Sequence, residues 1–142
     1  MAADTSKREP GSGWRAIAQT SGTRAFDAAF TTNPVLETSV LNGPLVGTAA
    51  VDAFFVATAH GMYDSLRFTT ETNDGRKTYL EWEGKVFGVD VGGATILTRD
   101  ATGLIESIRL YHRPLLVVLK FSKELARRLQ GKIDSNLLGE SE

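Results

Sequence analysis

The sequence predicts a single α+β domain, and three observations carry this prediction. Apolar residues recur at helical spacing in most of the chain up to Gly61, and the spacing then changes to alternation over 65–113. The alternating segments follow one another through short turns without intervening helices, which favours an antiparallel sheet over a Rossmann fold. No G-x-G-x-x-G or G-x-x-x-x-G-K-S/T motif is present, so no nucleotide-phosphate loop is indicated.

The first elements are helical. Apolar residues repeat at helical spacing over 14–30, and Ser21-Gly22 interrupts them, which predicts two short helices or one kinked helix. Asn33-Pro34 ends this region, because the residue before a proline avoids the helical conformation. The apolar and β-branched segment 35–41 predicts a short strand, and 42–44 predicts a turn.

A longer helix is expected between Gly47 and Gly61, with Thr48 as a candidate N-cap and the glycine at its end. Four residues at helical spacing define its buried side. They are Val51, Phe54, Phe55 and Thr58.

Four strands should follow. They are expected at 65–72, 78–87, 94–99 and 104–113. The turn signals between them are Asn73-Asp74-Gly75, Gly92-Gly93 and Asp100-Ala101-Thr102-Gly103. In the second strand the side chains of Leu80, Trp82 and Val86 share the buried face.

A last helix is predicted over 115–130, with Pro114 in its first turn and Gly131 at its end. One side of this helix is expected to face the core. Its residues are Leu115, Leu119, Ser122, Leu125 and Leu129.

Length and the ends of the chain fit one domain. The chain has 142 residues. We expect the domain to span 14–131, between a flexible N-terminus over 1–13 and a flexible tail over 132–142, because both ends are rich in small and charged residues. No apolar run has the length of a signal peptide or a membrane span, so we expect a cytoplasmic protein without a membrane partner.

Composition excludes several classes of function. The formal net charge is −1, which argues against a nucleic-acid partner. The chain has no cysteine, so disulfides, thiolate metal sites and a cysteine nucleophile are excluded. His60 and His112 are the two histidines, and no metal site or cofactor is expected. His60 falls at a helix end, where a structural role is expected.

Two groups of residues carry a resemblance to a known family. The first is Val35-Leu36-Glu37-Thr38 with Gly43-Pro44-Leu45-Val46-Gly47 and Val51…Phe54-Phe55. The second is Asp100-Ala101-Thr102-Gly103-Leu104-Ile105…Ile108…Tyr111. With the order of elements over 14–113, they make the chain resemble the nuclear transport factor 2-like (NTF2-like) superfamily. That group includes ketosteroid isomerases, SnoaL-type polyketide cyclases and scytalone dehydratase-like enzymes. The resemblance implies a cystatin-like cone, a curved sheet wrapped around helices with a hydrophobic pocket at its open end.

The catalytic residues of the steroid isomerases are missing. By resemblance, the place of their general base holds Thr38, and the places of their oxyanion hole hold Trp14 and Thr95. The two supporting tyrosines fall on Phe30 and Phe55. A threonine hydroxyl is too weak a base to remove an α-proton at neutral pH, so isomerisation by that mechanism is not expected.

The expected pocket is apolar with few polar groups, which suits a small hydrophobic ligand, aromatic or polycyclic. Its predicted binding residues are Trp14, Phe30, Thr38, Phe55, Thr95, Leu97, Ile108 and Leu110. The candidate catalytic residue is His112, because an imidazole titrates near neutral pH. The same apolar residues would also suit a plain core, and a buried histidine bonded to the backbone is the structural alternative. A slip of one residue in strand register would exchange His112 with Tyr111.

Two hypotheses remain open. The first is a cofactorless isomerase, cyclase, dehydratase or lyase that uses His112. The second is a non-catalytic module that binds a hydrophobic ligand or assembles as a dimer. A homodimer through the outer face of the sheet is expected, because that face is partly apolar and carries Tyr and Arg. Its residues are Phe87, Ile96, Ile105, Ser107, Arg109, Tyr111 and Arg113.

Overall fold

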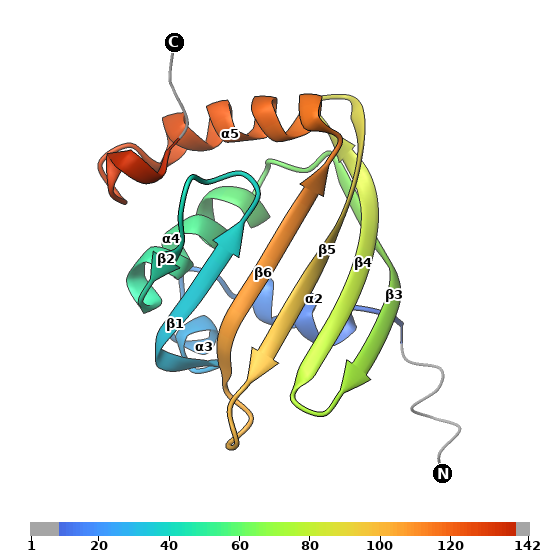
Figure 1. Cartoon of the computed structure of the whole chain (residues 1–142), viewed down its shortest axis with the longest axis vertical. Coiled ribbons are helices and arrows are strands. Elements are labelled where there is room, and N and C mark those ends of the chain that lie inside the picture. The colour runs from blue at the N-terminus through green and yellow to red at the C-terminus, as the bar shows by residue number, and fades with distance from the viewer. Residues whose placement is uncertain (1–8, 139–142) are drawn as a thin grey trace.

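A curved mixed sheet and four helices make up the part of the protein that the computed structural model describes, residues 9–138 (Figure 1). The strands are β1 (Phe30–Thr38), β2 (Leu45–Val46), β3 (Ser65–Asp74), β4 (Lys77–Val86), β5 (Val89–Arg99) and β6 (Ile105–Arg113). The helices are α2 (Ser12–Ala18), α3 (Arg24–Asp27), α4 (Thr48–Ala59) and α5 (Leu115–Leu129). A short 3₁₀ turn, η1 (Ser135–Leu137), follows α5.

The strand order in the sheet is β2-β1-β6-β5-β4-β3. Neighbouring strands are antiparallel except for β1 and β6, which pair in parallel. The α+β class is therefore confirmed, with one parallel pair in an otherwise antiparallel sheet. Strand β1 begins at Phe30, earlier than the predicted 35, and β2 was not predicted because it is only two residues long.

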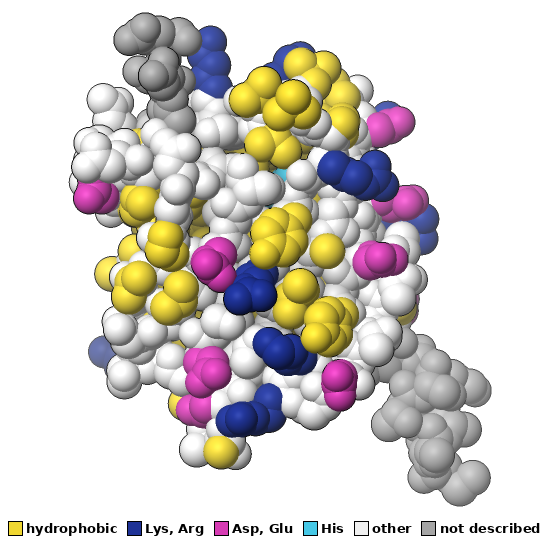
Figure 2. Space-filling view, in the orientation of Figure 1, with side chains coloured by type: hydrophobic (Ala, Val, Ile, Leu, Met, Phe, Trp, Pro, Cys, Tyr) yellow, Lys and Arg dark blue, Asp and Glu magenta, His cyan; other side chains and the backbone are white. Residues whose placement is uncertain are grey.

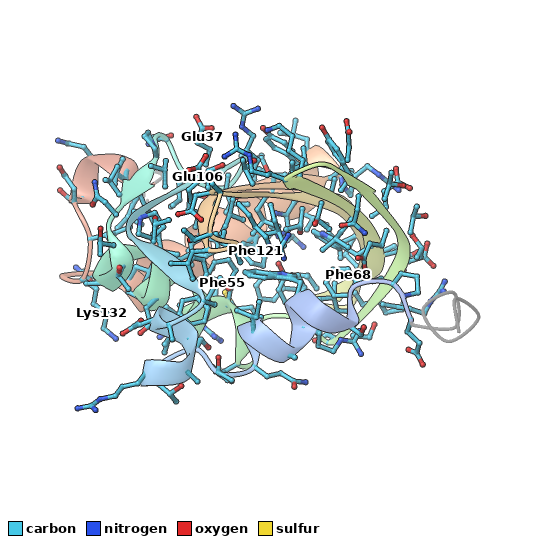
Figure 3. All side chains as sticks on the ribbon, turned by 90° about the horizontal axis from the view of Figure 1, so that it is seen from below. Glu37, Phe55, Phe68, Glu106, Phe121 and Lys132 are labelled. Carbon is cyan, nitrogen blue, oxygen red and sulfur yellow. The ribbon has the colours of Figure 1, made fainter. Side chains whose placement is uncertain are left out.

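The sheet curves around helices α2, α3 and α4, and α5 lies across one end of the strands (Figure 1). Seen from below, Phe55 and Phe121 fill the space between the sheet and the helices, whereas Glu37 lies on the opposite, convex side (Figure 3). Phe26, Phe54 and Phe121 are completely buried there. The concave side of the sheet therefore forms the core.

The turn between β4 and β5 differs from the prediction. It lies at Phe87-Gly88, where both residues have positive φ, 53° and 74°. Gly92 and Gly93, the predicted turn, lie inside β5. A Cβ on Gly93 would be 2.5 Å from Cζ2 of Trp82, so this glycine serves the close approach of an indole rather than a turn.

Helix α4 buries the predicted four residues, Val51, Phe54, Phe55 and Thr58. Its N-cap is Gly47 rather than the predicted Thr48. Thr48 is the first helical residue, and its hydroxyl donates to the carbonyl oxygen of Thr32 at 3.3 Å. The threonine thus ties the start of α4 to β1.

Helix α5 buries only part of the predicted side, since Leu125 and Leu129 are completely buried but the leucines nearer its start are not. Leu115 and Leu119 are 71% and 59% exposed, so placing them in the core was wrong. The buried residues are Val117, Phe121, Leu125, Ala126 and Leu129. Leucines lie on both sides of this helix, and the aromatic Phe121, completely buried, decides which side faces the sheet.

The start of β6 also differs. Ile105 was expected on the outer face but is 1% exposed. Thr98 of β5 pairs with Ser107 of β6, and the next residue, Arg99, pairs with Ile105, so Glu106 has no partner on β5 and forms a bulge. Such a bulge reverses the alternation of side chains on its two sides, which turns Ile105 inward.

Part of each expected flexible end lies outside the described residues, namely 1–8 and 139–142. In the described part of the tail, Leu137 and Leu138 pack against the core. The backbone N–H of Asn42 donates to the carbonyl oxygen of Leu137 at 2.8 Å, and its side chain donates to that of Leu138 at 2.9 Å. Within residues 9–138 no helix has the length and apolar character that crossing a membrane requires.

Candidate functional site

A cavity of about 310 Å³ opens between the concave face of the sheet and helices α2 and α4. Most of its lining is aromatic or aliphatic. The lining residues are Trp14, Arg15, Ala18, Gln19, Phe55, Thr58, Ala59, Tyr63, Leu66, Phe68, Trp82, Thr95 and Leu110. Arg15 and Gln19 are exposed, so they lie where the cavity meets solvent. Mostly apolar walls with a few polar groups are the usual character of a small-molecule site.

Helical periodicity places the residues of α2 and α4 that line the cavity on one face of each helix. On α2, Trp14 and Ala18 are four residues apart and therefore share a face. On α4, Phe55 and Ala59 do the same. The indole of Trp14 packs edge-on against the ring of Phe55, with 5.3 Å between ring centroids. This contact joins the two helices into one wall of the cavity.

The entrance carries one cation. The guanidinium of Arg15 lies 5.6 Å from the ring centroid of Phe68, within the range of a cation–π contact. Its Nη2 donates to the carbonyl oxygen of Leu66 at 3.4 Å. Arg15 is thus held beside the cavity by the first residues of β3.

Inside the cavity, Trp82 and Thr95 form a polar pair between β4 and β5. The indole Nε1–H of Trp82 donates to the hydroxyl oxygen of Thr95 at 3.1 Å. Thr95 is 2% exposed and Trp82 is 4% exposed. Because an indole N–H can only donate, the Thr95 oxygen is the acceptor and its own hydrogen remains available.

Tyr63 and His112 form the second polar pair. The hydroxyl oxygen of Tyr63 lies 2.7 Å from Nε2 of His112. Tyr63 belongs to the loop between α4 and β3, and His112 to β6. Tyr63 lines the cavity, whereas His112 lies behind it, packed against Trp82 and Phe121 with ring centroids at 5.1 and 4.6 Å.

Burial controls the ionisation of this pair. Removal from water disfavours the charged form of each group. It lowers the pKa of His112 to about 4, so the imidazole is neutral at pH 7. It also raises the pKa of the Tyr63 hydroxyl above its ordinary value, so the phenol keeps its proton. At neutral pH the pair is therefore an uncharged phenol hydrogen-bonded to an uncharged imidazole.

The other ring nitrogen of His112 is buried without a partner. No donor or acceptor in the described part of the chain is within hydrogen-bond distance of Nδ1. The backbone N–H of His112 is satisfied, because it donates to the hydroxyl of Ser39 at 2.9 Å. The imidazole thus depends on Tyr63 for its one hydrogen bond to another side chain.

The predicted binding residues fall into two groups. Trp14, Phe55, Thr95 and Leu110 line the cavity. Phe30, Thr38, Leu97 and Ile108 are buried but do not line it. The Thr38 hydroxyl instead accepts a hydrogen bond of 3.4 Å from the backbone N–H of Val40.

Tyr63 was missed by the sequence analysis, although it is the side chain through which His112 reaches the cavity. It lies in a loop, where no periodic pattern marks a buried position. Trp82 could have been included among the predicted binding residues, because alternation had already assigned its side chain to the inner face of its strand. Among residues 9–138 no group of three or more His, Asp or Glu side chains could hold a metal ion.

The curved sheet around helices, with a mostly apolar cavity on its concave side, is the architecture that the resemblance to the NTF2-like class led us to expect. Solved structures place the chain in that class by fold. An uncharacterized bacterial protein with a cystatin-like fold from Silicibacter pomeroyi has a TM-score of 0.74 at 17% identity, over 81% of each chain. A steroid delta-isomerase from Pseudomonas aeruginosa has a TM-score of 0.72 at 18% identity, over 84% of this chain and 88% of its own.

An NTF-2-like protein of unknown function from Burkholderia xenovorans has a TM-score of 0.54 at 13% identity, over 75% of this chain and 84% of its own. No protein-family model matches the sequence, and no curated protein matches it. The chain therefore has the NTF2-like, SnoaL-like fold that its sequence motifs indicated.

Proposed function

We propose that this protein binds a small, mostly hydrophobic molecule in the cavity between α2, α4 and the sheet. The observation that carries the proposal is a mostly apolar cavity of about 310 Å³ whose lining includes three residues with a hydroxyl group, Thr58, Tyr63 and Thr95. Apolar walls favour an apolar body, and buried hydroxyls favour one or two oxygen atoms on it.

The size of the cavity narrows the class of ligand. Ligand pockets in proteins span roughly 300–1,000 Å³, so this one is at the small end of the range. A molecule of one or two fused rings fits it better than a polycyclic one. The entrance carries Arg15, which favours a ligand with electron-rich rather than cationic substituents there.

Tryptophan fluorescence tests this proposal directly. The chain has two tryptophans, Trp14 and Trp82, and both line the cavity. We expect 2-acetylnaphthalene to change their emission in a saturable titration, with calorimetry as a second readout. Ala18→Phe fills the cavity from α2 and should weaken binding at least tenfold.

Ala16→Phe is the matched control, because Ala16 is exposed on the same helix and does not line the cavity. It should leave the affinity unchanged. Equal affinities in both variants, or no saturable binding to the original protein, would contradict the proposal. Native mass spectrometry of the freshly purified protein is a second test, in which a bound small molecule would support the proposal.

A cofactorless isomerase, cyclase, dehydratase or lyase is the second candidate function. The Tyr63–His112 pair favours it, because a hydrogen-bonded phenol and imidazole are groups that enzymes use to polarise an oxygen and move a proton. In this candidate the Tyr63 hydroxyl contacts the substrate and His112 acts through it. Once a substrate is identified, unchanged turnover by His112→Leu would contradict it.

We also propose that the convex face of the sheet forms a homodimer. Tyr79 and Tyr111 are 39% and 43% exposed on this face. In the sheet Tyr79 lies opposite Ile96, and Tyr111 lies opposite Ala94. Ala94 and Ile96 are two residues apart on β5, so the two pairs are neighbours on the same face. Figure 2 shows hydrophobic side chains interspersed with Lys and Arg over the same strands. Exposed tyrosines among arginines are typical of interface centres.

A further inference from the structure

We propose that the first turns of helix α5 bind the surface of a membrane that contains anionic lipids. The contact surface, which we call the α5 patch, combines four exposed apolar side chains with two lysines. Its residues are Phe87, Leu115, Leu116, Leu119, Lys120 and Lys123. The expectation of no membrane partner rested on the absence of an apolar run long enough to cross a membrane, and contact with a lipid surface needs no such run.

The leucines of the α5 patch are not needed for the core. Helix α5 already has a complete buried side between Val117 and Leu129. Leu115, Leu116 and Leu119 lie outside it and are 71%, 54% and 59% exposed. Positions three and four apart are neighbours on a helix, so Leu119 lies beside both other leucines. A single exposed leucine is ordinary, but a cluster indicates a surface that binds something apolar.

The β4–β5 turn adds an aromatic ring to the patch. Phe87 is 45% exposed, and its φ of 53° is unfavourable for a bulky side chain. The backbone N–H of Gly88 donates to the carboxylate of Asp64 at 2.8 Å, which holds the turn in this conformation. Phe87 lines a groove beside α5 together with Lys120 and Lys123. An exposed phenylalanine in a strained turn is typical of a position kept for binding.

The charges of α5 favour an anionic partner. The helix has four cations and one carboxylate, whereas the whole chain has a formal net charge of −1. The carboxylate of Glu124 pairs with Arg127 and Arg128. Among residues 9–138 no carboxylate is within ion-pair distance of Lys120 or Lys123. These two ammonium groups are therefore available to the phosphates of anionic lipids.

The position of the patch suits a flat surface. Helix α5 lies across one end of the strands, at the outer limit of the fold (Figure 1). Hydrophobic side chains gather over the start of α5, with Lys and Arg at their border (Figure 2). None of the three leucines lines the groove beside α5, so they project outward rather than form a recess for a peptide. Projecting leucines enter the boundary between headgroups and acyl chains, while the lysine ammonium groups stay at the phosphates.

Cosedimentation of the full chain with vesicles tests this inference. The probes are vesicles of phosphatidylcholine alone and of phosphatidylcholine with about one-third phosphatidylserine. We expect the anionic vesicles to bind at least about tenfold more tightly, and salt at about 1 M to remove most of this difference. Equal binding to both kinds of vesicle, or binding to neither, would overturn the inference.

The apolar part of the patch has its own variant. Replacing Leu115, Leu116 and Leu119 together by serine should weaken binding to the anionic vesicles at least about tenfold. Val56→Ser is the matched control, because Val56 is an apolar residue of α4 that is 39% exposed. It should bind as the original protein does. Equal losses in the two variants would show that the leucines have no special role, and the inference would be wrong.

The charged part is tested separately. Lys120→Glu combined with Lys123→Glu should also weaken binding at least about tenfold. Lys77→Glu is the control, since Lys77 is exposed at the other end of β4 from the patch. Thermal unfolding checks that each variant is folded. If the leucine variant does not fold, the lysine pair and the salt dependence decide.

A second copy of the chain is the alternative occupant of the patch, and it predicts a different result. The original protein would then bind neither kind of vesicle. Light scattering would show a lower mass for the leucine variant than for the original protein and for Val56→Ser. This outcome would overturn the inference and assign the leucines to an interface between copies.

Discussion

Among residues 9–138, the hydroxyl of Tyr63 is the single side-chain hydrogen-bond partner of the His112 imidazole, 2.7 Å from Nε2. The two residues are 49 positions apart in the chain and meet only in the folded protein. Any proton added to this imidazole at low pH would therefore be placed in an apolar core. This relationship makes the stability of the fold dependent on pH.

Stability should fall as the pH drops through the range in which the unfolded His112 titrates. The pKa of this residue is about 4 in the folded protein and 6.5 in the exposed state, so between these values the unfolded chain binds a proton that the folded one does not. The contribution of His112 to the free energy of unfolding is complete above pH 6.5. It is lost as the pH falls toward 4, and the total loss is about 3 kcal/mol.

Urea unfolding at a series of pH values checks this prediction. His112→Gln is the control, because its side chain does not titrate and the remaining acid-sensitive groups are unchanged. The unfolding free energies of the two proteins should converge as the pH falls. Parallel curves over the same range would show that His112 does not carry the effect.

Gly93→Ala should destabilise the fold far more than Gly92→Ala. A Cβ on Gly93 would collide with the Trp82 indole and the carbonyl oxygen of Tyr111, both fixed in the sheet. A Cβ on Gly92 would meet the guanidinium of Arg113 at 2.6 Å, a flexible group that is able to move away. We expect a loss of about 1–3 kcal/mol for Gly93→Ala and a small change for Gly92→Ala. Chemical denaturation of both variants measures the difference, and equal losses would refute the explanation.

The two sides of α5 should respond differently to truncation. Phe121 is completely buried between α5 and the sheet, so Phe121→Ala should cost about 3–5 kcal/mol. Leu119 is 59% exposed, and Leu119→Ala should stay within about 0.5 kcal/mol of the original protein. Thermal unfolding separates the two outcomes. A large loss in Leu119→Ala would indicate that another surface covers this leucine in solution.

The dimer proposed for the convex face predicts a change in mass. Light scattering at micromolar concentration should give twice the chain mass for the original protein and the chain mass for Tyr111→Glu, because a charge would be buried at the interface. Leu115→Glu, on the exposed side of α5, is the control and should remain dimeric. If the original protein is a monomer, the proposed dimer is wrong. If Leu115→Glu is monomeric and Tyr111→Glu is still a dimer, the interface lies on α5 instead of on the convex face.

Much of the fold followed from local patterns. Alternation placed Leu80, Trp82 and Val86 on the inner face of β4, where all three are buried. Helical spacing identified the buried side of α4. These predictions succeeded because a strand or helix with one buried side repeats its apolar residues at the period of its own geometry.

The predictions that failed depended on neighbours from distant parts of the chain. Gly92-Gly93 has the composition of a turn, but the glycines are required by the indole that packs on them. Ile105 changed sides because of a bulge that alternation along one strand does not reveal. Leu115 and Leu119 were assigned to the wrong side of α5, since its leucines occupy more than one side.

The sequence by itself determined the α+β class, the inner face of β4 and the NTF2-like resemblance. Only the tertiary structure decided which groups meet in the cavity. It brought Tyr63 from a loop to His112 on β6, and it left Phe30, Thr38, Leu97 and Ile108 in the core around that cavity. Periodicity reports which side of an element is buried, whereas a site depends on curvature, register and loop paths that bring different elements to one point.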